Sequence, residues 1–201
     1  MRERAGRPTA KGGRRARRPH VVGIDDGPFE KHSSPDTPLV AVVMEGPDLV
    51  EGVAVARFPV DGNDAGGFLT GWIRGLRFHP GLQGIVLGGI TLAGLGVVDI
   101  EALAEGTGVP VLVVNRRDPA TSRLTAALRA AGLEDRVDLI SRAPVAFRSA
   151  RGVFLACAGI GAREAEALVE AVTGKADLPE PLRLAHLIAA AIARGSSHGR
   201  V

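Results

Sequence analysis

Two adjacent carboxylates, Asp25 and Asp26, follow a short apolar segment near the start of the chain, residues 21–24. The apolar segment predicts a β-strand, and the Gly27-Pro28 pair that comes next predicts a turn. Paired carboxylates at a strand end suit Mg²⁺, a hard cation that binds oxygen ligands and commonly takes one or two protein carboxylates. An Asx-type turn is the structural alternative, because Asp-Gly and Gly-Pro sequences favour turns by themselves.

Further acidic residues lie in predicted loops and add candidates to the same site. Asp61 and Asp64 belong to residues 60–64 (VDGND), and Asp99 directly precedes a predicted helix. If these carboxylates converge with Asp25, they complete a ligand set for a divalent cation. For Asp64 and Asp99 the spacing is equally typical of an N-cap, in which the carboxylate accepts hydrogen bonds from the first N–H groups of a helix.

The glycine-rich residues 87–96 follow a predicted strand, a position where some proteins bind phosphate. Their sequence, LGGITLAGLG, fits neither the G-x-G-x-x-G nor the G-x-x-x-x-G-K-[ST] pattern, which argues against nucleotide binding by those mechanisms. Gly88 and Gly89 instead suit a close backbone approach to the metal site or to a nucleic-acid strand. Periodicity alone assigns Cys157 to an apolar core and His186 to a structural position on the last helix.

The elements that must position these residues alternate in a regular order. Two β-branched segments joined by residues 45–48 (EGPD) predict a hairpin, so the first three strands form an antiparallel meander. Helical spacing in residues 68–78 and a short helix near residues 100–105 separate the next strands, which indicates parallel strands joined by right-handed crossovers. The predicted strands are residues 21–24, 39–44, 49–58, 84–87 and 109–114.

The C-terminal part adds helices and a further strand pair. Helices are predicted over residues 119–131, 162–173 and 181–194, and a strand pair over residues 145–147 and 153–156. Three antiparallel strands followed by helix-strand-helix-strand is the order of a ribonuclease H-like α/β domain. We therefore predict a mixed sheet flanked by helices, in a single domain that spans residues 20–201.

The composition fits such a domain. The 201 residues are 45% hydrophobic and 23% charged, which is typical of a soluble globular protein. The longest apolar run, residues 184–193, contains His186 and is far short of the roughly 20 residues that a membrane span requires. A single cysteine excludes an internal disulfide and a multi-cysteine zinc site, and we expect a reducing, cytoplasmic setting.

The basic charge is concentrated in the N-terminal tail. Residues 1–20 hold seven Arg and one Lys against one Glu, so they carry +7 and the remaining chain carries −4. Such an Arg-, Gly- and Pro-rich segment buries too little apolar surface to offset its ordering entropy, so we predict that residues 1–19 are disordered. Two roles stay open: a solubilising tail or misassigned start, and a nucleic-acid arm that gains affinity by counterion release.

Several motifs, in the right order, resemble those of endonuclease V and together cover about residues 20–200. Residues 22–25 (VGID) resemble that family's first strand with its metal-binding aspartate, and residues 179–186 resemble its Pro-Glu-Pro-x-Arg-x-Ala-His segment. The chain is more similar still to endonuclease dU, a small archaeal family related to endonuclease V. The motifs that carry this second resemblance are residues 23–27 (GIDDG), 60–65 (VDGNDA), 88–94 (GGITLAG) and 179–183 (PEPLR).

The resemblance implies roles for individual residues. Asp25 corresponds to the first metal-binding aspartate and His186 to the metal-side histidine, in a site for Mg²⁺ or Mn²⁺. Asp64 is the acid nearest to the position of the family's glutamate. Arg116 and Arg117 correspond to the basic residue that follows a Pro-containing strand, which implies a contact with phosphate.

Two departures from endonuclease V affect this assignment. Gly88 and Gly89 stand where that family has Asp-Gly, so Asp26 or Asp99 would have to supply the missing carboxylate. The two glycines would then contact the nucleic acid. The family's Pro-Tyr-Ile-Pro strand-separating wedge is also absent, since the chain contains no Tyr and offers only residues 58–61 (FPVD).

The residues and the resemblance together predict a Mg²⁺-dependent endonuclease that hydrolyses phosphodiester bonds near deaminated bases, as in DNA repair. The expected partner is nucleic acid, with DNA favoured over RNA, and no membrane partner is expected. A non-catalytic nucleic-acid-binding module of the same fold is the first alternative, favoured by the missing carboxylate at Gly88. A small-molecule enzyme that uses the acidic pocket and the glycine-rich loop is the second. The preferred base and the oligomeric state do not follow from the sequence.

Overall fold

The computed structural model describes residues 18–31, 33–119 and 121–197. The strands are β1 (His20–Asp26), β2 (Asp36–Glu45), β3 (Leu49–Pro59), β4 (Gly84–Leu87), β5 (Thr91–Leu92), β6 (Gly96–Val97), β7 (Val111–Asn115), β8 (Phe147–Arg148) and β9 (Phe154–Ala158). The helices are α1 (Ala65–Gly75), α2 (Ile100–Thr107), α3 (Thr121–Ala130), α4 (Val137–Arg142), α5 (Ala162–Ala171) and α6 (Glu180–Arg194), with two 3₁₀ turns, η1 (His79–Gly81) and η2 (Glu134–Arg136).

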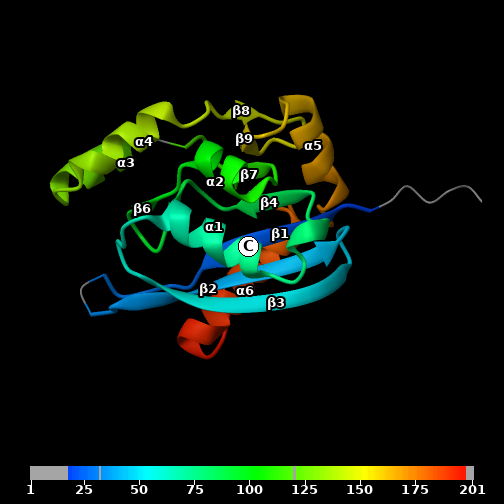
Figure 1. Ribbon diagram of the computed structural model, residues 1–201, viewed down its shortest axis with the longest axis horizontal. Coiled ribbons are helices and arrows are strands. Elements are labelled where there is room, and N and C mark those ends of the chain that lie inside the picture. The colour runs from blue at the N-terminus through cyan, green and yellow to red at the C-terminus, as the bar shows by residue number, and fades with distance from the viewer. Residues whose placement is uncertain (1–17, 32, 120, 198–201) are drawn as a thin grey trace, which may run out of the picture.

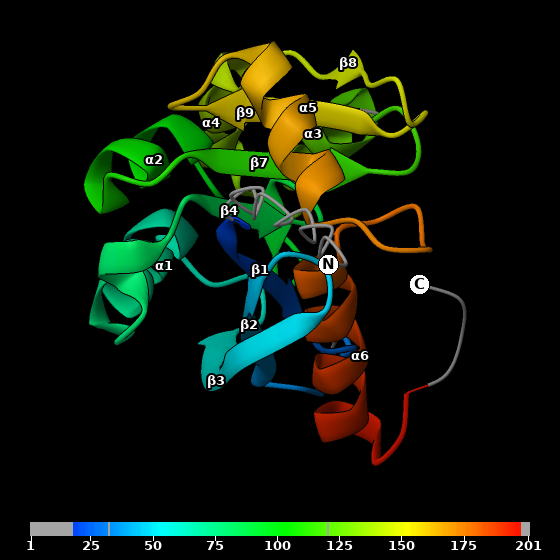
Figure 2. The same ribbon diagram turned by 90° about the vertical axis from the view of Figure 1, so that its right-hand side faces the viewer.

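A seven-stranded sheet in the order β3-β2-β1-β4-β7-β9-β8 lies at the centre, and β5 and β6 pair separately (Figure 1). Helices cover both faces of the sheet. Figure 2 shows α1 and α2 on one side and α5 and α6 on the other. The predicted mixed sheet flanked by helices is therefore confirmed.

The N-terminal half is the predicted antiparallel meander. β1 pairs with β2 along its whole length, and β2 pairs with β3. Side chains alternate between the two faces of a strand, so Val40, Val42 and Met44 pack against α6, whereas Ala41 and Val43 belong to the core under α1. Because both faces of β2 are covered, this strand is an almost continuous apolar run.

β4 and β7 extend the sheet from β1 as parallel strands. Both are buried on their two faces, which explains why each is a short apolar run without polar alternation. β9 then pairs with β7 in the antiparallel direction, and β8 pairs with β9. Parallel strands end at the same edge of a sheet, so the residues that follow β1, β4 and β7 lie side by side.

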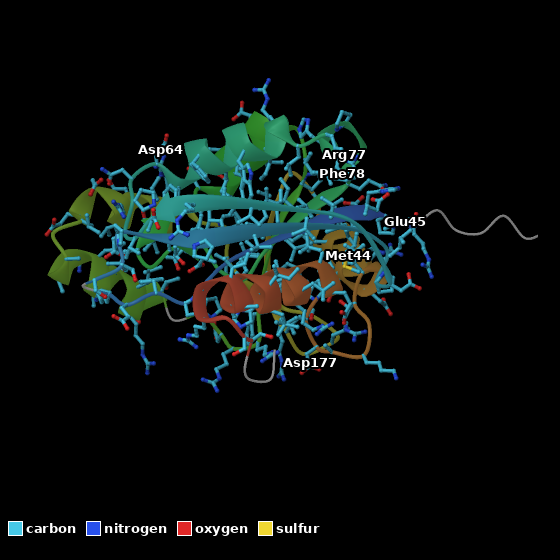
Figure 3. The ribbon with its side chains drawn as sticks, turned by 90° about the horizontal axis from the view of Figure 1, so that it is seen from below. Met44, Glu45, Asp64, Arg77, Phe78 and Asp177 are labelled. Carbon is cyan, nitrogen blue, oxygen red and sulfur yellow. The ribbon has the colours of Figure 1, made fainter. Side chains whose placement is uncertain are left out.

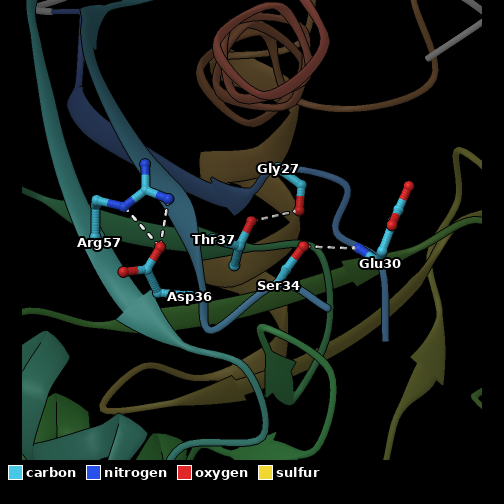
Figure 4. Close-up of polar contacts among 6 residues, drawn as sticks. All are labelled: Gly27, Glu30, Ser34, Asp36, Thr37 and Arg57. Atoms are coloured by element: carbon cyan, nitrogen blue, oxygen red, sulfur yellow. Dashed lines mark hydrogen bonds and ion pairs between the residues drawn. The ribbon is translucent and has the colours of Figure 1, made fainter. Parts of the chain in front are cut away.

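The loop after β1 is held by polar contacts, which Figure 4 shows. The Thr37 hydroxyl donates a hydrogen bond of 2.8 Å to the backbone oxygen of Gly27. At the same end of the sheet, Arg57 of β3 donates through Nε to Asp36 of β2 at 2.7 Å. The Thr37 contact fixes the chain directly after the strand end that carries the two aspartates.

Four short features lie outside the sequence prediction: the β5–β6 hairpin, η1, η2 and α4. All are too short to show a periodic pattern, and the hairpin turns through Ala93 and Gly94, whose φ angles are 49° and 93°. Arg136 of η2 is only 5% exposed and donates to the backbone oxygen of Leu95 at 2.7 Å and to the side chain of Asn63. This buried cation fastens the hairpin and the β3–α1 loop to η2.

Most of the predicted basic tail, residues 1–17, lies outside the described residues. Its last two residues do not follow the prediction of disorder, because both contact the β2–β3 turn. Arg18 Nη2 lies 3.0 Å from Asp48 Oδ2, and the Pro19 oxygen accepts a hydrogen bond of 2.9 Å from the Gly46 N–H. None of the described helices is long and apolar enough to cross a membrane.

Candidate metal and nucleic-acid site

Asp25 lies at the carboxyl end of β1, beside the carboxyl end of β4. Ile24 pairs with Leu87 across the two parallel strands, so the next residues, Asp25 and Gly88, are neighbours. A Cβ atom at position 88 would lie 3.6 Å from Asp25 Oδ1, an ordinary van der Waals distance. Gly88 therefore occupies a position from which a second carboxylate would reach Asp25, and it leaves that space open.

Close packing of α6 against β1 brings His186 to Asp25. A Cβ atom at Gly23 would lie 2.2 Å from the backbone nitrogen of Leu182, so this approach of helix and strand requires glycine. One turn further along α6, His186 Nδ1 lies 2.7 Å from Asp25 Oδ2. An ionised carboxylate only accepts hydrogen bonds, so Nδ1 carries the proton and donates it.

This hydrogen bond raises the pKa of His186, and the negative charges of Asp25 and Asp26 act in the same direction. Partial burial of the imidazole and the charge of Arg116 oppose the increase. The imidazole side chain remains 46% exposed, so it is open to solvent and to a ligand. His186 is thus a positioned and accessible proton-carrying group, contrary to the structural role that periodicity assigns to it.

Asp26 is the last residue of β1, and it lines two cavities together with Asp25. It lies against the β5–β6 hairpin, where the Ala93 N–H donates to its carboxylate. Burial, and after it the negative charge of Asp25, raises the pKa of Asp26 to about 6. At neutral pH two carboxylates therefore repel each other at this strand end, and a bound cation would relieve the repulsion. We call Asp25, Asp26 and His186 the carboxyl-end site.

Adjoining cavities open around Asp25. One of about 170 Å³ is lined in part by Asp25, Asp26, Gly88, Gly89 and Thr91. A second, of about 300 Å³, is lined in part by Asp25, Gly88, Asn115, Arg116 and His186. A carboxylate, an imidazole and a guanidinium therefore face one space. Arg117 is exposed and is not among the residues that line these two cavities.

Asn115, which the sequence analysis does not single out, links this space to a larger one. It ends β7 and also lines a cavity of about 1050 Å³ that begins at Gly89 and runs along α3 and α4. Its position follows from the rule that parallel strands end at one edge of the sheet. Applied to the residue after each apolar run, that rule is the signal that could have identified Asn115 from sequence.

Asp64 and Asp99 do not join Asp25. Both are N-caps: Asp64 Oδ1 accepts from the Gly67 N–H at 2.9 Å, and Asp99 accepts from the N–H groups of Glu101 and Ala102. They line a different cavity, of about 500 Å³, between α1 and α2. The structure thus replaces the predicted ligand roles of these two aspartates with helix capping, which the spacing also allowed.

The donor set at the carboxyl-end site fits a hydrated hard cation. Asp25, Asp26 and His186 do not bring three ligand atoms within 4.8 Å of one another; among the described residues, His20, Glu45 and Glu51 are the group that does so. Mg²⁺ commonly binds one or two carboxylates and keeps several waters, so a fully protein-made cage is unnecessary. Asp25 and Asp26, with open cavity beside them, meet that requirement.

The antiparallel meander followed by parallel strands, with a carboxylate at the end of the central strand, defines the ribonuclease H-like class. Solved structures of endonuclease V share this fold at low identity. The Ciona intestinalis enzyme, in complex with inosine-containing DNA, has a TM-score of 0.50 and 13% identity and covers 84% of this chain and 82% of its own. The Streptomyces avermitilis enzyme has a TM-score of 0.50 and 19% identity, with 83% and 77% covered.

Within this class, the chain belongs to the endonuclease dU family, whose sequence profile matches residues 17–193. A "UPF0215 protein" of Methanothermobacter thermautotrophicus is 38% identical, covering 89% of this chain and 90% of its own. A second one, from Deinococcus radiodurans, is also 38% identical, covering 90% and 92%. The crystal structure of an Archaeoglobus fulgidus protein of unknown function has a TM-score of 0.80 and 34% identity, covering 90% and 99%. The predicted family is confirmed.

Proposed function

We propose that this protein is a divalent-metal-dependent nuclease that hydrolyses a phosphodiester bond in nucleic acid, near deaminated bases in DNA. The observation that carries the proposal is the shared cavity in which Asp25, His186 and Arg116 meet. A carboxylate binds a hard cation, an imidazole transfers protons, and a guanidinium binds phosphate through paired hydrogen bonds. Membership of a family named for an endonuclease and the DNA complex of the Ciona enzyme support this reading.

In this proposal, Asp25 and Asp26 hold Mg²⁺ or Mn²⁺. A cation held by these two carboxylates would supply an activated water and would stabilise negative charge on the leaving oxygen. Asp25 also orients His186 by accepting the Nδ1 proton, which leaves Nε2 to exchange a proton with water or with the leaving oxygen. Because Asp25 raises the pKa of His186, a larger fraction of the imidazole is protonated near neutral pH and carries a proton on Nε2.

Other residues bind the nucleic acid in this proposal. Arg116 lines the cavity of His186 and pairs with a phosphate oxygen, and Arg117, being exposed, contacts the flanking backbone. Gly88 and Gly89 have no side chains to block a nucleic-acid strand at the cavity mouth. The larger cavity that starts at Gly89 and Asn115 has a partly apolar lining and suits a base turned out of the helix.

A non-catalytic nucleic-acid-binding module is the second candidate. Gly88 supplies no carboxylate next to Asp25, and the carboxylates of Asp64 and Asp99 serve helix caps instead. A protein with one carboxylate pair and a basic rim would bind phosphate without cleaving it. The two candidates differ in metal-dependent turnover, so cleavage separates them.

The decisive experiment is gel cleavage of oligonucleotides that contain uracil, hypoxanthine or an abasic site, as DNA and as RNA, with Mg²⁺, Mn²⁺ or chelator. Asp25→Asn keeps the side-chain size but removes the charge that holds the cation, so cleavage should fall about a hundredfold or more while binding persists. Asp36→Asn, in the exposed pair with Arg57, is the control and should cleave normally. Cleavage that is unchanged by chelator and by Asp25→Asn would contradict the proposed metal-dependent nuclease. Binding of the oligonucleotides without cleavage by the wild type would favour the non-catalytic binding module.

The proposed nucleic-acid arm is tested separately by deleting residues 1–17. Each phosphate contact that is lost should reduce the slope of log affinity against log salt by about 0.9 on B-DNA. A shallower slope with unchanged cleavage rate at saturating substrate is the expected result. An unchanged slope would assign the tail a solubilising role.

A further inference from the structure

The amino end of β1 carries a second group of ionisable side chains. His20, the first residue of β1, pairs with Glu45, the last residue of β2. A register shift between Val43 and Met44 gives β3 one extra residue, and it brings Glu51 to the same end of the sheet. We call His20, Glu45 and Glu51 the amino-end cluster.

This cluster is separate from the carboxyl-end site. Five steps of extended strand lead from His20 to Asp25, which corresponds to roughly 17 Å. Figure 3 shows Glu45 near one end of the molecule and Asp64, which follows β3, toward the opposite end. A ligand at the amino-end cluster would therefore not touch Asp25.

The three side chains converge on one point. His20 Nδ1 lies 2.6 Å from Glu51 Oε2, and one ligand atom from each of the three residues lies within 4.8 Å of the other two. The His20 and Glu51 side chains are 28% and 24% exposed, so they are half-buried but open to an entering ion. The His20 backbone is fixed as well, because its N–H donates to Gln83 Oε1 at 3.1 Å.

The charge of the cluster is not balanced by the described protein groups. Two carboxylates face one imidazole, and within residues 18–31, 33–119 and 121–197 neither glutamate forms an ion pair with Lys or Arg. Arg18 pairs with Asp48 instead, and Arg77 stacks on the ring of Phe78 at 4.4 Å. Among the described residues, the two glutamates therefore leave the cluster with an excess of negative charge, which favours a bound cation.

We propose that His20, Glu45 and Glu51 form a second metal site that binds Zn²⁺. One imidazole nitrogen and two carboxylate oxygens are ligand types that Zn²⁺ accepts, and a water completes four-coordination. The ion takes the place of the hydrogen between His20 Nδ1 and Glu51 Oε2, and the neutral imidazole then carries its one proton on Nε2. It links β1, β2 and the edge strand β3, and its role is to stabilise the meander rather than to act on substrate.

The test uses full-length Asp25→Asn protein, in which the carboxyl-end site is disabled, and titrates it with Zn²⁺ in a calorimeter. One Zn²⁺ should bind per chain and raise the melting temperature. Adding Glu45→Gln should weaken the affinity at least tenfold, because it removes a charged ligand that holds no described protein partner. Co²⁺ provides an independent readout, since four-coordinate Co²⁺ gives visible absorption bands that Glu45→Gln should abolish.

Matched variants keep the test decisive. Glu105→Gln on the exposed face of α2 removes the same charge elsewhere and should leave Zn²⁺ affinity unchanged. Glu51→Gln should weaken binding as Glu45→Gln does, and circular dichroism checks that each variant folds. Absence of Zn²⁺ binding, or equal affinity in Glu45→Gln and Glu105→Gln, would overturn the proposal. The cleavage assay is not involved, so this outcome is independent of the proposed nuclease.

Discussion

The two ends of β1 gather ionisable groups by different routes. At the carboxyl-end site, the two aspartates are adjacent in the sequence, and close packing of α6 adds the histidine. At the amino-end cluster, three residues from three strands meet only because antiparallel pairing and one register shift align them. A local sequence motif thus predicts the carboxyl-end site, whereas the amino-end cluster depends on strand register and carries no motif.

The largest loss of stability should come from adding a side chain at Gly23, which packs against α6 beside the carboxyl-end site. Gly52, which follows Glu51 of the amino-end cluster, is the matched position. A Cβ atom at Gly23 would meet the backbone of Leu182 at 2.2 Å, and one at Gly52 would meet the ring of Phe78 at 2.4 Å. Backbone cannot move aside as a ring can, so Gly23→Ala should lower the free energy of unfolding by about 3 kcal/mol and Gly52→Ala by about 1 kcal/mol. Urea denaturation measures both.

Gly23→Ala should also separate His186 from Asp25, because α6 must shift. The pKa of His186, followed by NMR, should then fall toward its ordinary value, whereas Gly52→Ala should leave it unchanged. Equal destabilisation by the two variants would contradict the claim that the two ends depend on different kinds of contact.

Asp26→Asn should stabilise the protein in chelator at neutral pH. The raised pKa, about 6 in place of 3.8, means that folding becomes less favourable as pH rises from about 4 to 6, because the folded state must ionise a buried group. The substitution removes this penalty, on the order of 2–3 kcal/mol at pH 7. The raised pKa of His186 also contributes stability at low pH that is lost as pH rises. In Asp26→Asn, the free energy of unfolding should therefore still fall with rising pH, but with a smaller slope than in the wild type.

Urea denaturation of wild type and Asp26→Asn between pH 4 and pH 8 checks this prediction. The gap between the two proteins should open as pH rises and narrow when Mg²⁺ or Mn²⁺ is added, since the cation stabilises the ionised wild type. A gap that is independent of pH would show that burial at Asp26 does not act through its charge.

Gly88→Asp should restore a carboxylate beside Asp25. A Cβ atom fits there at 3.6 Å from Asp25 Oδ1, and Gly88 is not among the glycines with positive φ, so the backbone accepts a side chain. We expect Mn²⁺ affinity to increase about tenfold, because a second negative ligand reaches the same cation. Gly88→Asn, whose side chain has the same size without the charge, should show no such gain in Mn²⁺ affinity. Weaker Mn²⁺ binding by Gly88→Asp would contradict the claim that position 88 lies beside Asp25.

The smallest effect is expected at Asp64. Asparagine caps a helix as well as aspartate does and tolerates the left-handed backbone found here, φ 52°. Asp64→Asn should therefore change stability by less than about 0.5 kcal/mol and leave cleavage unchanged. A loss of cleavage as large as that expected for Asp25→Asn would show that Asp64 takes part in the metal site.

The fold was largely predictable because its signals are local. Apolar runs bounded by turn residues predict β1 to β4 and β7, and the Pro-Glu-Pro segment predicts the start of α6 within a residue. The short elements were missed because two-residue strands such as β5 carry no periodicity. In the candidate site, the place of Asp25 at a strand end identifies it as a candidate ligand, whereas His186 is identified only through the resemblance, because periodicity assigns it a structural position.

The sequence by itself determined the α/β fold, the family, and the carboxylates at the end of the first strand, since each depends on the order of residues along the chain. Only the tertiary structure decided which acids share a space. Asp64 and Asp99 are of a residue type that binds metal ions, but their carboxylates accept hydrogen bonds from the first N–H groups of α1 and α2 instead. His20 and Glu45 carry no motif, yet strand pairing places them side by side, because register converts distant positions into neighbours.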